Sequence, residues 1–131
     1  GMTKSGNLAH YYSGICYLRM GQYEEALDHL KSFRKKDLLV SSMAISATGD
    51  CYMELNEPER AAGYYEDAAD LNANDLTSPQ FLLKAGWAWE LAGDYGRAIQ
   101  AYERIRTEFP QSVESRDIDK YIAYARGRQA S

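Results

Sequence analysis

The chain has 131 residues, with 15 basic and 19 acidic side chains and a formal net charge of -4. This length suits one small domain that buries roughly two thirds of its unfolded surface, so its stability requires no disulfide. A nucleic-acid partner is not expected, because charges are spread evenly and the one basic cluster closes an expected helix whose dipole it complements: Lys31, Arg34, Lys35 and Lys36.

One pattern of four positions recurs three times along the chain. A small residue is followed by an aromatic residue three positions later, a turn residue four beyond that, and an alanine five beyond the turn. The three copies are Gly14, Tyr17, Gly21 and Ala26; Gly49, Tyr52, Asn56 and Ala61; and Gly86, Trp89, Gly93 and Ala98. Because every copy keeps the same order and spacing, the sequence predicts one helical hairpin repeated three times.

Each glycine that opens the pattern lies inside an expected helix, where glycine costs roughly 0.5 to 1 kcal/mol relative to alanine. Its presence at all three sites indicates that a second helix approaches closely there. The expected contacts are the large residues four positions after each alanine, Leu30, Tyr65 and Tyr102. The aromatic residues of the pattern are expected to fill the core between the helices of each hairpin.

The turn residues are of types that tolerate a left-handed backbone, so each is expected to end the first helix of its hairpin. Pro58 suits the first turn of a following helix, and Ser78 before Pro79 predicts a helix that begins with a serine cap. Ser112 is expected to cap a last helix with one apolar stripe, formed by Val113, Ile118, Tyr121, Ile122 and Ala125.

These positions resemble the tetratricopeptide repeat, a helical hairpin of about 34 residues with aromatic, glycine, alanine and proline signatures. The resemblance implies an all-α fold in which residues 1–131 form one domain, a right-handed α-solenoid of three hairpins. The expected hairpins span about residues 7–38, 41–74 and 79–110, and a capping helix spans about 112–127.

The same resemblance implies a non-enzymatic protein-interaction module whose partner lies on the concave face formed by the first helix of each hairpin. This face is largely apolar and aromatic, so the expected partner is an apolar or amphipathic segment of a protein. The expected groove residues are Tyr11, Ile15, Arg19, Met43, Ser46, Asp50, Met53, Leu83, Lys84 and Trp87. Co-chaperone members of the family hold a C-terminal carboxylate with basic and amide side chains, but among the matching positions only Lys84 carries a suitable charge.

The sequence predicts no catalytic, cofactor-binding or metal-binding site. It contains no phosphate-binding loop, no serine nucleophile elbow and no histidine pair at a metal-ligand spacing, since His10 and His29 fall on different expected helices. Cys16 and Cys51 occupy the same position in adjacent repeats. They are expected to be buried free thiols, because helix axes ~8 to 10 Å apart place them beyond disulfide reach.

The first expected helix is apolar on almost every side, and a helix of that kind is normally buried on every side. Leu8 and Tyr12 are therefore expected to form a surface that either a second copy or upstream chain covers. A self-associating scaffold, working as a homodimer through this helix, is the alternative function.

Over nearly its whole length the chain also resembles the C-terminal half of bacterial membrane-anchored tetratricopeptide proteins. The residues that carry this resemblance are 6–9, 14–17, 36–37, 78–79 and 117–122. It implies a translocation or folding assembly on the periplasmic face of the inner membrane, held by an anchor upstream of this segment; a cytoplasmic location is the alternative. No membrane insertion by the segment itself is expected, and Gly1 before Met2 resembles the remnant of a cleaved tag.

Overall fold

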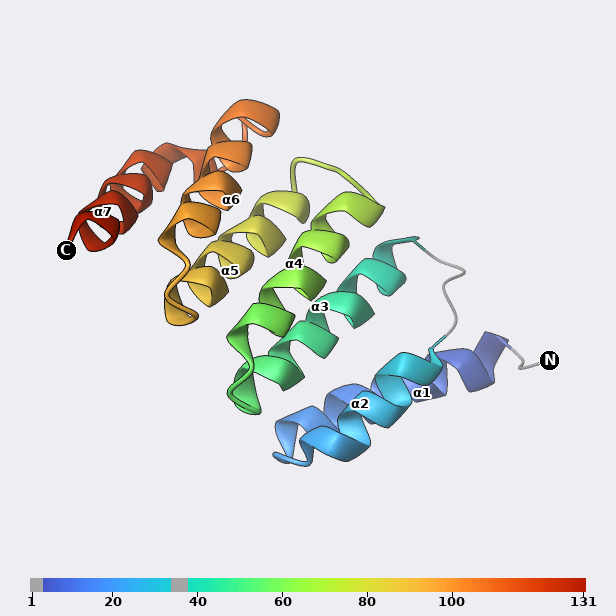
Figure 1. Ribbon diagram of the computed structural model, residues 1–131. Coiled ribbons are helices and arrows are strands. Elements are labelled where there is room, and N and C mark those ends of the chain that lie inside the picture. The colour runs from blue at the N-terminus through green and yellow to red at the C-terminus, as the bar shows by residue number, and fades with distance from the viewer. Residues whose placement is uncertain (1–3, 34–37) are drawn as a thin grey trace.

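The computed structural model describes residues 4–33 and 38–131, which form seven α-helices and one short 3-10 helix. The elements are α1 (Lys4–Arg19), α2 (Tyr23–Ser32), α3 (Leu38–Glu54), α4 (Pro58–Leu71), α5 (Ser78–Leu91), α6 (Tyr95–Glu108), η1 (Glu114–Asp117) and α7 (Ile118–Ala130). Figure 1 shows the helices stacked in chain order as hairpins, with α7 against α6 at the C-terminal end. The expected all-α solenoid of three hairpins with a capping helix is confirmed.

The two helices of a hairpin approach most closely at the pattern glycines. A Cβ atom added to Gly49 would lie 2.7 Å from Cε1 of Tyr65, and one added to Gly86 would lie 2.1 Å from Cε1 of Tyr102. Both tyrosines are buried, so neither ring has free space into which it could retreat. These contacts confirm the close approach that the glycines predict.

The first hairpin uses different side chains for the same contacts. A Cβ atom on Gly14 would lie 2.6 Å from Cγ of Leu30, which is an aliphatic residue where the other hairpins have tyrosine. Tyr17 is half-buried and stacks on His29, with ring centroids 5.3 Å apart and an interplanar angle of 13°. The Nδ1 atoms of His29 and His10 are 3.1 Å apart, a contact between α1 and α2 that the sequence did not predict.

The pattern aromatics of the other two hairpins lie in the core as expected. Tyr52 and Trp89 are 3% and 6% exposed, whereas Tyr17 is only partly covered. Nε1 of Trp89 donates to Oε1 of Glu66 at 3.2 Å, which satisfies the one polar group of the indole. The core role predicted for this position is therefore correct for two hairpins and only partly correct for the first.

All three turn residues have the left-handed backbone that the sequence predicts. Their φ angles are 77° at Gly21, 62° at Asn56 and 80° at Gly93. The residue after each turn donates its N–H to the carbonyl of the pattern aromatic, at 2.9 Å for Gln22 and Tyr17, 2.8 Å for Glu57 and Tyr52, and 2.9 Å for Asp94 and Trp89. This six-to-one bond is that of a Schellman motif, so one turn geometry closes all three first helices.

Ser78 does not cap α5 as expected. It is the first residue of the helix and fully buried, and its hydroxyl donates to the carbonyl oxygen of Ala69 at 2.7 Å. The serine therefore ties the beginning of α5 to the end of α4 instead of closing its own helix. Pro79 lies in the first turn of α5, where its missing N–H removes no helical hydrogen bond.

The last helix begins later than the expected start near residue 112. Ser112 instead lies before the N-cap Val113 of the 3-10 helix η1, and its Oγ accepts from the backbone N–H of Ser115 at 3.3 Å. Val113 is 68% exposed, so it is not part of the apolar stripe. The stripe that packs against the core consists of Ile118, Tyr121, Ile122 and Ala125.

Charged side chains pair across neighbouring helices. Nη2 of Arg104 on α6 lies 2.7 Å from Oδ1 of Asp70 on α4. Nη1 of Arg106 on α6 lies 2.7 Å from Oδ1 of Asp119 on α7. In the basic cluster, Lys31 donates to the hydroxyl of Tyr52 at 2.8 Å, and the remaining members lie outside the described residues: Arg34, Lys35 and Lys36. These pairs help to hold the stack together, although exposed pairs of this kind contribute only up to ~1 kcal/mol each.

The glycine contacts generate a prediction with an internal control. Gly86→Ala should lower the free energy of unfolding by about 1 to 3 kcal/mol, because the new methyl group overlaps the buried ring of Tyr102. Gly63→Ala should raise it by about 0.5 to 1 kcal/mol, because Gly63 lies in α4 with no atom within 4 Å of the added Cβ. Urea unfolding measures both changes. Stabilisation by both would show that the contact does not require glycine.

Candidate functional site

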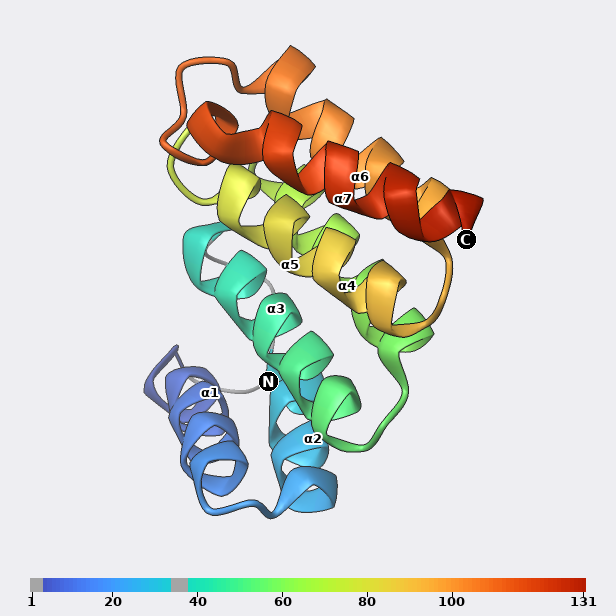
Figure 2. The ribbon, with the colours of Figure 1, turned by 90° about the vertical axis from the view of Figure 1, so that its left-hand side faces the viewer.

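The odd-numbered helices lie together on one face of the solenoid. Figure 2 shows α3, α5 and α7 side by side toward the viewer, with α4 and α6 behind α5 and α7. Nζ of Lys84 on α5 lies 2.8 Å from Oδ1 of Asp50 on α3, and the rings of Trp87 on α5 and Tyr121 on α7 meet edge-on with centroids 6.3 Å apart. We call the surface formed by α1, α3, α5 and α7 the odd-helix face.

The residues expected to line the groove differ in accessibility. Met43 and Trp87 are large apolar residues that remain 43% exposed, and Arg19 is exposed at the end of α1. Ser46 is buried, with 4% exposure, so its side chain is not open to a partner. The other expected groove residues are half-buried: Tyr11, Ile15, Asp50, Met53, Leu83 and Lys84.

Lys84 is engaged by its own chain. Besides pairing with Asp50, its ammonium donates to Oγ of Ser46 at 3.2 Å and lies 4.8 Å from the ring centroid of Tyr65. The hydroxyl of Tyr65 donates to Oδ1 of Asp50 at 2.5 Å, and burial together with this carboxylate raises the pKa of the tyrosine. A partner carboxylate would therefore have to compete with Asp50 for Lys84, which alone among the carboxylate-clamp positions carries a suitable charge.

A pocket of about 340 Å³ lies at the C-terminal end of the odd-helix face. It is lined by Trp87, Glu90, Leu91, Tyr95, Tyr124 and Arg128. Sequence reasoning missed Tyr124 and Arg128 because it gave the last helix only a covering role. The available signal was their spacing from Tyr121, since positions three and seven residues apart lie on one side of a helix.

The outer side of α1 carries the residues expected to need a cover. Tyr12 is 62% exposed and Met20 is 61% exposed, whereas Leu8 is partly buried against the core. Cys16 is exposed on the same helix, so the expectation of a buried thiol is wrong for this residue. Cys51 is buried as expected, in a second hairpin that packs against both the first and the third.

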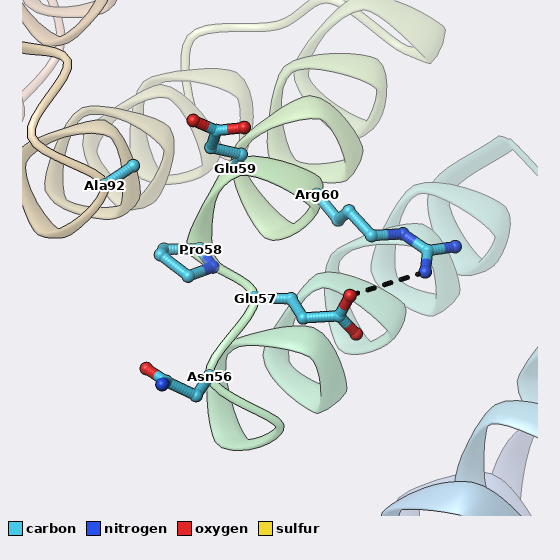
Figure 3. A pocket seen from close by; sticks show the side chains of 6 residues that line it. All are labelled: Asn56, Glu57, Pro58, Glu59, Arg60 and Ala92. Atoms are coloured by element: carbon cyan, nitrogen blue, oxygen red, sulfur yellow. Dashed lines mark ion pairs between the residues drawn. The ribbon is translucent and has the colours of Figure 1, made fainter.

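Figure 3 shows a second pocket of about 340 Å³, located at the turn between α3 and α4. Part of its wall is formed by Asn56, Pro58 and Ala92. Oε1 of Glu57 lies 3.6 Å from Nη1 of Arg60. The pocket's other lining residue is Glu59. The pocket combines a turn with paired surface charges and offers no nucleophile beside a base, so it does not indicate catalysis.

Within residues 4–33 and 38–131, no three His, Cys, Asp or Glu side chains gather closely enough to hold a metal ion. The contact between His10 and His29 brings together two such side chains only. None of the helices described above combines the length and the apolar character needed to cross a membrane.

Comparison with known proteins identifies the repeat. The family model described as tetratricopeptide repeat matches residues 13–75 and 46–113, which together make up most of the chain. The chain belongs to the tetratricopeptide repeat family. No curated protein matches its sequence. The narrower resemblance to bacterial membrane-anchored members gains no support from these comparisons.

A solved structure with the same tetratricopeptide fold aligns over the whole chain. It is described as the first TPR of Spaghetti (RPAP3) bound to the HSP90 peptide SRMEEVD. The two structures superpose with a TM-score of 0.74 at 19% sequence identity, covering 99% of this chain and 98% of that chain. At this identity the match establishes the fold.

The thiols of Cys16 and Cys51 should react with a thiol reagent at very different rates. At pH 8, Cys16 should react promptly with a colorimetric disulfide reagent, and Cys51 should stay unmodified until the protein unfolds. Burial, reinforced by the charge of Asp50, raises the pKa of Cys51 to about 11, so only about one molecule in a thousand carries the thiolate at pH 8. Cys16→Ser should remove the fast reaction and Cys51→Ser should keep it. Two fast thiols would contradict the buried environment of Cys51.

Proposed function

We propose that the odd-helix face binds an apolar or amphipathic segment of a protein partner. The observation that carries this proposal is the exposure of Trp87 on α5 and Met43 on α3, two large apolar side chains on helices of the odd-helix face. Large apolar side chains that remain accessible on a concave surface are the usual anchors of a protein interface. The related fold of the RPAP3 domain, which is described as peptide-bound, supports a peptide as the partner's binding element.

The two tryptophans of α5 lie in different surroundings, one suited to the core and the other to binding a partner. Trp89 is buried and hydrogen-bonded to Glu66, whereas Trp87 projects from the odd-helix face and touches Tyr121 with its ring edge. Only one of them is therefore available to a partner. Arg19 lies exposed at the end of α1 and can set the register of a bound segment, whereas Asp50 is already paired with Lys84.

A self-associating scaffold is the second candidate function. Tyr12 on α1 and Met20 directly after α1 are exposed on the first hairpin, and terminal repeats of a solenoid normally carry a polar outer face. A second copy could cover these two side chains. The setting expected from the narrower resemblance, a translocation or folding assembly at a bacterial envelope, rests on that sequence resemblance alone.

Trp87→Ala should weaken binding to amphipathic peptides at least about tenfold and leave the free energy of unfolding within about 1 kcal/mol of the parent. Trp89→Ala should lower that free energy by about 3 to 5 kcal/mol, because it removes a buried indole. A peptide array and thermal melts measure the two effects. If both variants melt at the same reduced temperature, Trp87 is a packing residue and not an anchor.

Self-association is tested by light scattering at micromolar concentration. The parent protein should show a concentration-dependent increase in mass, and Tyr12→Glu should abolish it because a charge enters the contact between two copies of α1. Tyr124→Glu makes the same chemical change at the opposite end of the solenoid and should leave the association intact. A parent protein that stays monomeric throughout would reject the scaffold function.

A further inference from the structure

The pocket at the C-terminal end of the odd-helix face has an apolar floor and one accessible charge. Trp87, Leu91 and Tyr124 line it with 43%, 69% and 59% of their surfaces exposed. These side chains come from α5 and α7, and Trp87 is fixed in place by its edge contact with Tyr121. A volume of about 340 Å³ accommodates one large side chain of a partner.

Arg128 forms one wall of this pocket and keeps most of its hydrogen-bonding capacity. Its Nη2 donates to the hydroxyl of Tyr95 at 3.2 Å, and the guanidinium lies 5.7 Å from the centroid of the same ring. A guanidinium has five N–H donors, and its hydrogen bonds to the hydroxyls of Tyr95 and Tyr124 leave further donors free. The tyrosines therefore hold Arg128 in position while leaving donors for a carboxylate, which arginine binds in a two-pronged geometry.

The other charges near the pocket are less accessible than that of Arg128. Glu90 is half-buried and accepts a hydrogen bond from the hydroxyl of Tyr102. Asp94, beside Tyr95, lies 3.5 Å from the guanidinium of Arg97. Among the side chains that line this pocket, Arg128 is exposed whereas Glu90 is half-buried with one carboxylate oxygen bonded to Tyr102, so the more accessible charge is positive.

We propose that this pocket takes a large apolar side chain of the partner together with a neighbouring acidic side chain, the first against Trp87 and Tyr124 and the second on Arg128. This assignment rests on the proposed function of the odd-helix face and names the partner chemistry. It places the acidic group at α7, away from Lys84, whose charge Asp50 already occupies. A second copy of the chain is not needed for the site, because α5, α6 and α7 of one copy complete it.

A competing ligand is a cation held over the aromatic rings. Trp87, Tyr95 and Tyr124 offer ring faces, and the carboxylate of Glu90 lies in the same wall. Arg128 already lies over the ring of Tyr95, however, and would repel a second cation. An acidic ligand and a cationic ligand predict opposite preferences among charged peptides, so one binding experiment distinguishes them.

The experiment uses three fluorescent peptides of equal length with the same apolar side chains and with glutamate, glutamine or lysine at the same flanking positions. Fluorescence anisotropy should show the tightest binding for the glutamate peptide and the weakest for the lysine peptide. Arg128→Gln should weaken the glutamate peptide roughly threefold to fivefold and leave the glutamine peptide unchanged. Raising the salt concentration should shrink the difference between the glutamate and glutamine peptides.

Arg126→Gln is the matched control, because it removes the same charge from the same helix at a residue that pairs with Glu103 at 3.1 Å. It should leave all three affinities unchanged. A preference for lysine, or equal effects of the two arginine substitutions, overturns the acidic assignment. If all three peptides bind equally and Trp87→Ala weakens them, the groove function stands and this proposal fails. If none binds, the proposal is also rejected.

Discussion

One steric constraint organises this domain: the second helix of each hairpin inserts a large side chain against a position where the first helix has no Cβ. Tyr65 on Gly49 and Tyr102 on Gly86 set the spacing of two hairpins, and Leu30 on Gly14 sets that of the first. The same rings then make polar contacts with acidic side chains of the first helices. Packing and hydrogen bonding within a repeat therefore depend on a missing methyl group.

The fold could be predicted from the sequence because the residues that determine it lie close together along the chain and recur in each repeat. The glycine, the aromatic residue, the left-handed turn and the alanine lie close together along the chain, and each has one physical reason to occur. Reasoning failed where a residue's partner lies in another element. The sequence predicts Ser78 as a cap for its own helix because nothing local shows that Ala69 accepts its hydroxyl. Cys16 and Cys51 hold the same position in adjacent repeats, but Cys16 is exposed and Cys51 is buried.

The candidate site was readable only in part, for the same reason. Trp87 stands out because it does not occupy a position of the repeated pattern, whereas Trp89, two residues later, occupies that of the core aromatic. The pairing of Lys84 with Asp50 joins residues of different repeats, and no spacing rule within one helix reveals it. Arg128 was overlooked because a capping helix was treated as a cover, whereas α7 continues the odd-helix face and adds side chains to it.

The first hairpin has a different relation to the rest of the domain. Leu30 cannot donate the hydrogen bond that Tyr65 and Tyr102 donate to acidic residues of α3 and α5. A solenoid is stabilised by its individual repeats and by the interfaces between neighbours, so a repeat with a weaker internal bond opens more readily than the others. Backbone amides of α1 and α2 are therefore expected to exchange with solvent through openings that leave the later helices folded.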